Sequence, residues 1–154
     1  MRHGTTLFIR VVLILIGLCA CAFLLWEPHI EGRNANATVF EIYFNDPFLA
    51  YVYVGSTPFF VGLFQAFKFL GYAGRNQEHS NAALKSVRTI KYSALTLIGF
   101  VAIGEVFILL NESDDRAGGV FMGMLFTVAA MAVATAMLIL ERTLGNAGVK
   151  SSKE

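Results

Sequence analysis

Four stretches of mainly apolar residues constrain this chain more than any other feature. They are residues 7–26, 47–67, 93–110 and 120–140, and Arg10 and Glu105 are the only charged residues within them. A helix of about 20 such residues crosses the roughly 30 Å hydrocarbon core of a bilayer. The sequence therefore predicts four transmembrane helices.

The overall composition agrees with this prediction. The 154 residues are 56% hydrophobic and 15% charged, whereas soluble domains have about a quarter of their residues charged. A small soluble domain has too much surface to hide so many apolar side chains. We therefore expect one all-α integral membrane domain, residues 1–154. The net charge of +1 gives no reason to expect direct nucleic-acid binding.

Positive charge is distributed unevenly between the two sides. Ten of the twelve Lys and Arg residues flank the N-terminus, the connection at 73–92 or the C-terminal end, and only Arg33 and Arg116 fall on the other side. Cytoplasmic segments of membrane proteins carry this excess of Lys and Arg. We expect an antiparallel four-helix bundle in a bacterial cytoplasmic (inner) membrane. Both termini would be cytoplasmic (N-in, C-in), with an outer loop at 27–46.

Local signals extend the helices beyond these stretches. Asp46 and Pro47 predict the N-cap and first position of the second helix, which continues to about residue 72. Ser80 or Asn81 predicts the cap of a long third helix over residues 80–110. Pro58 is expected to kink the second helix. Residues 38–44, which are aromatic and β-branched, are expected to form a short strand or an interfacial segment.

The first stretch is expected to be a retained membrane anchor. Its apolar core is longer than the 7–15 residues typical of a signal peptide. A lipoprotein cleavage site at Cys21 is disfavoured because more hydrocarbon follows it.

Two other patterns indicate contact surfaces. Lys85, Arg88 and Lys91 form a basic helix face, which is expected to contact anionic lipid or, alternatively, a protein partner. Small residues recur at four-residue spacing in the last stretch, and such residues let helices approach closely. They are Gly119, Gly123, Ala130 and Ala134. We expect them to pack against a neighbouring helix of the same chain, with a second copy as the alternative.

The downstream two-thirds of the chain resembles a family of small bacterial membrane proteins known as domain of unknown function 2975. Three stretches carry the resemblance: ALKSVRTIKY at 83–92, DDRAGG at 114–119 and LERTLGNA at 140–147. The resemblance implies four transmembrane helices and no established activity, substrate or catalytic residue. It also implies a membrane component of a regulatory pair, because genes of the family lie beside small helix-turn-helix regulators.

Glu105 is the strongest candidate for a functional site. It lies six residues, or about 9 Å, before the expected end of its span at Asn111. Charged residues inside a membrane are costly and mark functional sites by default. Other polar residues are expected at the same depth, although depth alone does not show whether they face Glu105. They are Cys19, Tyr53, Ser56, Thr57 and Thr127.

Two interpretations of Glu105 stay open. A protonated Glu105 could hydrogen-bond Tyr53, Ser56 or Thr57 and hold helices together, at about 1 kcal/mol, or reach the headgroups through local water. Alternatively, it could bind a proton, a cation or a ligand.

No enzyme motif is present, so we expect no enzymatic activity, metal or cofactor. The three His residues form no i, i+4 pair, and no phosphate-binding glycine loop or G-x-S-x-G occurs. The leading hypothesis is a regulatory or sensory membrane subunit paired with a cytoplasmic DNA-binding regulator. The alternative is a small transporter or channel subunit that uses Glu105, which would require a homo-oligomer.

Overall fold

The computed structural model describes residues 3–30, 36–44, 46–110 and 116–151, and the regular structure in these ranges is helical throughout. The helices are α1 (His3–Ile30), α2 (Val39–Phe44), α3 (Pro47–Ala73), α4 (Asn81–Leu110) and α5 (Arg116–Ser151). All but α2 are long and apolar enough to cross a membrane. The prediction of an all-helical chain with four such helices is confirmed, and the four predicted stretches lie within them.

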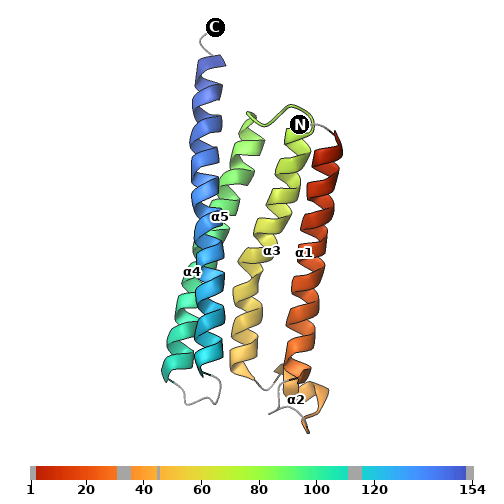
Figure 1. The fold of residues 1–154 in the computed structure, drawn as a ribbon, viewed down its shortest axis with the longest axis vertical. Coiled ribbons are helices and arrows are strands. Elements are labelled where there is room, and N and C mark those ends of the chain that lie inside the picture. The colour runs from red at the N-terminus through yellow and green to blue at the C-terminus, as the bar shows by residue number, and fades with distance from the viewer. Residues whose placement is uncertain (1–2, 31–35, 45, 111–115, 152–154) are drawn as a thin grey trace.

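The long helices pack mainly against their neighbours in the chain. Among the described residues, α4 packs against α3 on one side and α5 on another, while α1 packs against α3. Figure 1 shows the four long helices lying along one axis, with α2 at the end where α1 leads into α3. The principal contacts therefore follow the order α1, α3, α4, α5, with α4 most extensively packed.

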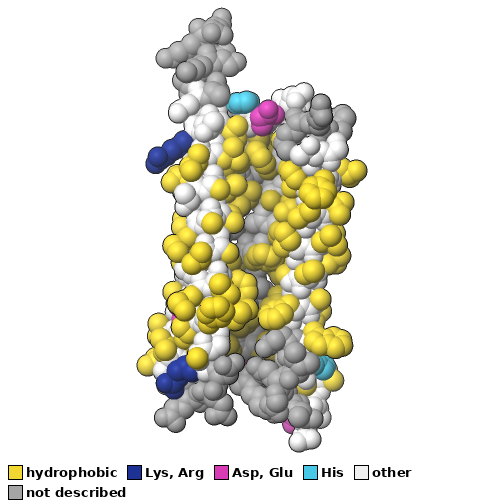
Figure 2. Space-filling view, viewed as in Figure 1, with side chains coloured by type: hydrophobic (Ala, Val, Ile, Leu, Met, Phe, Trp, Pro, Cys, Tyr) yellow, Lys and Arg dark blue, Asp and Glu magenta, His cyan; other side chains and the backbone are white. Residues whose placement is uncertain are grey.

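Large apolar side chains cover the outside of these helices. The buried apolar residues concentrate in the first half of α4, at Ala83, Val87, Ile90 and Ala94. Figure 2 shows apolar side chains along most of the visible face, with charged side chains near its two ends. This distribution suits a hydrocarbon surrounding. Arg33, Asn111, Asp114 and Asp115 of the sequence analysis lie outside the described residues.

The segment expected to be a strand or an interfacial stretch is the short helix α2, so the strand prediction was wrong. The Thr38 hydroxyl accepts a hydrogen bond from the Glu41 backbone N–H at 3.3 Å, and the Glu41 carboxylate accepts one from the Thr38 N–H at 2.8 Å. This reciprocal pair is a capping box, which starts a helix. The hydrogen bonds that the Glu41 carboxylate accepts, first from the Thr38 N–H and then from the Thr38 hydroxyl at 2.8 Å, lower the pKa of Glu41. The T-x-x-E spacing at 38–41 therefore indicated a helix start, although the aromatic and β-branched residues favoured a strand.

The predicted starts of α3 and α4 are confirmed. Asp46 Oδ1 accepts hydrogen bonds from the N–H groups of Phe48 and Leu49, at 2.8 and 3.3 Å, and Pro47 holds the first helical position. Ser80 Oγ accepts one from the Ala83 N–H at 3.2 Å, so Ser80 caps α4. The helix α3 is continuous through Pro58.

Candidate functional site

Glu105 lies in the contact between α4 and α5. Its side chain covers Gly123, so that a Cβ added at Gly123 would lie 2.9 Å from Glu105 Cγ and 3.0 Å from Cδ. Glu105 Oε1 is buried and has no hydrogen-bond partner among the described residues. A buried carboxylate oxygen without a hydrogen-bond partner is costly, so it marks Glu105 as a candidate binding group. Glycine at 123 is what leaves room for the carboxylate.

The small residues of α5 form the rest of this contact. A Cβ added at Gly119 would lie 3.1 Å from Ile108 Cδ1 of α4. Ala130 and Ala134, two and three turns beyond Gly123 on the same face, are buried. Thr127 shares this face by its spacing from Gly123 and is half-buried. The four small residues thus pack within the chain, and Thr127 follows Glu105 along the same α4–α5 contact.

The hydroxyl of Tyr53 is used elsewhere, in the contact between α3 and α1. It donates a hydrogen bond to the Leu24 carbonyl at 2.9 Å. Pro28, inside α1, has no N–H to donate to that carbonyl four residues before it. Tyr53 therefore satisfies a carbonyl that Pro28 leaves without its helical partner.

The other polar residues of the same depth also lie away from Glu105. The Ser56 hydroxyl donates to the Tyr53 carbonyl of its own helix at 2.8 Å. Thr57 and Cys19 are exposed. Of the polar set at one depth, only Thr127 of α5 lies, by its spacing from Gly123, on the helix face that meets Glu105.

On its other side α4 meets α3 through glycine and aromatic residues. A Cβ added at Gly104 would lie 3.4 Å from Tyr51 Cε1, and one added at Gly55 would lie 3.3 Å from Phe100 Cδ1. The Tyr51 hydroxyl donates to the Phe100 carbonyl at 2.6 Å. Glycine on each helix thus lets an aromatic ring of the other fit closely, and it leaves Glu105 pointing toward α5.

At the other end of the same contact, in the C-terminal part of α5, Glu141 is held between two cations of α4. Arg88 Nε lies 2.9 Å from Glu141 Oε1, and Lys91 Nζ lies 2.6 Å from Oε2. The side chains of Lys91 and Glu141 are only 15% and 17% exposed. Two of the three residues of the predicted basic face are therefore paired within the chain, while Lys85 is exposed. In the sequence, this pairing is indicated only by Glu141, an acidic residue on the side of the membrane where most Lys and Arg residues are expected.

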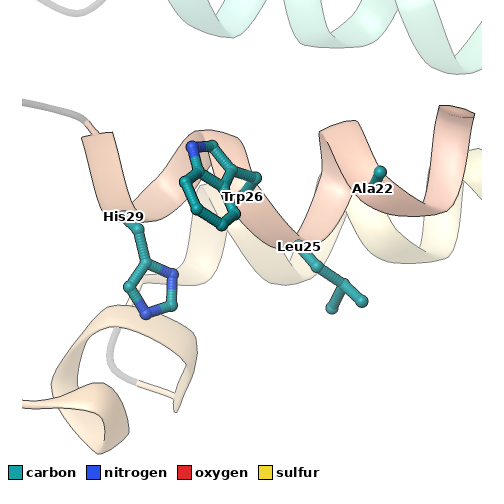
Figure 3. Close-up of a pocket in the computed structure, with 4 residues that line it drawn as sticks. All are labelled: Ala22, Leu25, Trp26 and His29. Atoms are coloured by element: carbon teal, nitrogen blue, oxygen red, sulfur yellow. The ribbon is translucent and has the colours of Figure 1, made fainter.

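A shallow apolar cavity of about 400 Å³ lies at the C-terminal end of α1. It is lined by Ala22, Leu25, Trp26 and His29, which occupy one stretch of that helix (Figure 3). The Tyr43 hydroxyl of α2 lies 2.7 Å from His29 Nδ1 and donates to the Leu25 carbonyl at 2.6 Å, fastening α2 to α1. Within the described ranges no group of three metal-ligating side chains occurs.

Comparisons with known proteins agree with the resemblance found in the sequence. The model of the family described as Protein of unknown function (DUF2975) matches residues 33–150. The chain is also 33% identical to "Uncharacterized membrane protein YoaS" of Bacillus subtilis (strain 168), over all of this chain and 98% of that protein. No solved structure matches the chain.

Proposed function

The chain belongs to the family described as Protein of unknown function (DUF2975), and we propose that this membrane protein is a regulatory or sensory subunit without enzymatic activity. Its partner would be a cytoplasmic DNA-binding protein of the helix-turn-helix kind, as the family resemblance implies. The proposal includes a bacterial cytoplasmic membrane and an antiparallel bundle with both termini inside. The distribution of Lys and Arg supports this orientation.

The length of α5 is the observation that carries the proposal. It has 36 residues, where about 20 suffice to cross a bilayer. Residues 141–151 continue it beyond the expected span by about 16 Å at 1.5 Å per residue. In Figure 1 this C-terminal end projects past the ends of the other long helices. A projecting helix offers a partner a surface that moves with the membrane part of the same helix.

The α4–α5 contact supplies a route between membrane and projection. Glu105 on Gly123 lies at one end of the contact, and the ion pairs of Glu141 with Arg88 and Lys91 lie at the other. A ligand or proton that changes the packing at Glu105 would therefore bias the tilt of α5. The ion pairs of Glu141 would link the start of the projecting part of α5 to α4, so that this part changes between two positions as the packing changes.

The experiment is capture of the partner with the full chain at native expression. The chain is purified in mild detergent, and co-purified DNA-binding proteins are identified by mass spectrometry. Arg142→Glu reverses an exposed charge on the projecting part of α5, and Arg75→Glu reverses one on the exposed turn after α3. We expect the same DNA-binding protein with wild type and Arg75→Glu, and its loss with Arg142→Glu. Repeated absence of any such protein from the wild-type sample would refute the regulatory role.

The buried Glu105 oxygen favours one second candidate, a transporter or channel subunit. A short four-helix chain encloses little space, so this function requires an oligomer in which copies share the pathway. Proton or cation flux is measured in vesicles containing wild type or Glu105→Gln. Flux that is lost in Glu105→Gln while unfolding stability is retained would support transport, and equal flux in both would count against it.

A further inference from the structure

Two glycines near the end of α3 open a groove for side chains of α1. Thr6 is buried, and its Cγ2 lies 3.5 Å from the position of a Cβ at Gly74. Arg10 lies one turn further along α1, with Nη2 3.3 Å from the position of a Cβ at Gly71. The long Arg10 side chain therefore crosses the contact between α1 and α3 at its cytoplasm-proximal end.

The charge of Arg10 is met by an aromatic ring and by no carboxylate of the described ranges. Its Cζ lies 5.1 Å from the centre of the Phe67 ring, a cation–π distance. Its Nε is buried and has no hydrogen-bond acceptor in the part of the chain that the structure describes. A buried N–H without an acceptor is costly, so this Nε favours an external anion that the guanidinium can also bind through its other donors.

Lys68 adds a second cation beside this groove. It follows Phe67 directly in α3, and its Nζ lies 5.6 Å from the centre of the Phe64 ring. As with Arg10, no acidic residue of the described segments forms an ion pair with it. This differs from α4, where Arg88 and Lys91 both form ion pairs with Glu141. Arg10 and Lys68 thus lie at the α1–α3 groove without the carboxylate partner that Arg88 and Lys91 have on α4.

We propose that Arg10, with Lys68 beside it, binds the phosphate group of a membrane phospholipid, with preference for an anionic lipid. The planar guanidinium matches a phosphate bidentately, whereas the ammonium of Lys68 adds charge without fixing orientation. Arg10 lies seven residues, about 10 Å, into α1, a depth that the phosphates of the inner leaflet reach.

The surroundings select a lipid over free phosphate. Phe64 is 62% exposed, and Leu7 and Phe8, which follow Thr6 in α1, are 64% and 69% exposed. These apolar surfaces accommodate acyl chains, whereas a free phosphate ion would lose its water on entering them. A zwitterionic headgroup presents the same phosphate with a cation attached, so it competes less well for Arg10 and Lys68.

The test compares the lipid response of matched full-length variants in detergent micelles. Phosphatidylglycerol is titrated into wild type, Arg10→Gln, Lys68→Gln and Lys85→Gln, and the rise in Tm gives an apparent affinity. Lys85→Gln removes the same charge from an exposed site on α4. We expect Arg10→Gln to bind the lipid about tenfold more weakly than wild type, because a charge-assisted bidentate contact is lost. Lys68→Gln should show a smaller loss, and Lys85→Gln should match wild type.

Diacylglycerol, which lacks the phosphate, and inorganic phosphate are added separately to identify the ligand. The proposal requires that neither raises the Tm of wild type more than that of Arg10→Gln. An equal lipid affinity for wild type and Arg10→Gln would overturn the site. A Tm rise with inorganic phosphate equal to that with lipid would overturn the lipid as its source. If Arg10→Gln does not fold, Arg10→Lys and the exposed Lys68→Gln decide, because both must weaken lipid binding relative to Lys85→Gln.

Discussion

At the scale of single residues, Pro28 removes a helical hydrogen bond within α1 and a tyrosine of α3 supplies another. The Tyr53 hydroxyl donates to the Leu24 carbonyl, which is the group that an N–H at position 28 would otherwise reach. In hydrocarbon an unsatisfied carbonyl is costly because water is absent. Tyr53, which the sequence analysis grouped with Glu105, thus has a structural task that ties α3 to α1.

Tyr53→Phe should lower the free energy of unfolding by about 1–3 kcal/mol, because the Leu24 carbonyl loses its partner. In a Pro28→Ala chain the same substitution should cost much less, since the alanine N–H restores the helical bond to Leu24. The measurement is reversible unfolding, in mixed micelles, of wild type, Tyr53→Phe, Pro28→Ala and the double variant. Tyr92→Phe is the control, since its hydroxyl makes no hydrogen bond within the described ranges. An equal cost of Tyr53→Phe in both backgrounds would contradict this explanation.

Residue type and approximate depth were enough to single out Glu105, but not to find what faces it. Depth follows from counting along each helix, whereas facing depends on the rotation of each helix about its axis. Here the face of α5 that carries Gly123 lies against Glu105, and the face of α4 that carries Gly104 lies against Tyr51. The pairing of Arg88 and Lys91 with Glu141 was missed for the same reason, because it joins residues about 50 positions apart.

At the scale of elements, helix ends were predicted well where a local motif specifies them. The Asp46 and Ser80 caps depend on a few adjacent residues, and both are present in the structure. The helix α2 was missed because β-branched and aromatic residues outweighed its capping box. A short helix with such residues depends heavily on its cap.

That dependence predicts a pH response of α2. The lowered pKa of Glu41 means that its carboxylate stabilises the helix at pH values above its ordinary pKa of 4.5. The stabilisation is lost as the pH falls from there through the lower pKa of the folded state. Amide exchange of residues 39–44, corrected for its intrinsic pH dependence, should speed up over this range. In Glu41→Gln the corrected exchange should not change with pH; a matching acceleration in that variant would refute the role of Glu41.

At the scale of the whole molecule, orientation depends on charge at the helix ends. The excess of Lys and Arg at the N-terminus, the α3–α4 connection and the C-terminal end predicts that these three regions share the cytoplasmic side. The segment before α2 would then face outward.

Single cysteines test this orientation in chains whose Cys19 and Cys21 are replaced by Ala. Asn36→Cys lies before α2 and Arg75→Cys lies in the α3–α4 turn, and both native side chains are exposed. A membrane-impermeant maleimide should label Asn36→Cys in intact spheroplasts and Arg75→Cys only after permeabilisation. The reverse pattern would mean that the chain has the opposite orientation.

The order of packing, α1 with α3, α3 with α4 and α4 with α5, has a consequence for how the protein is made. Helices enter the membrane in the order of synthesis, so each long helix after the first finds a helix that it packs against already inserted. Contacts between consecutive helices also form with little loss of chain entropy. No early helix has to wait, exposed, for a distant segment that the ribosome has not yet completed.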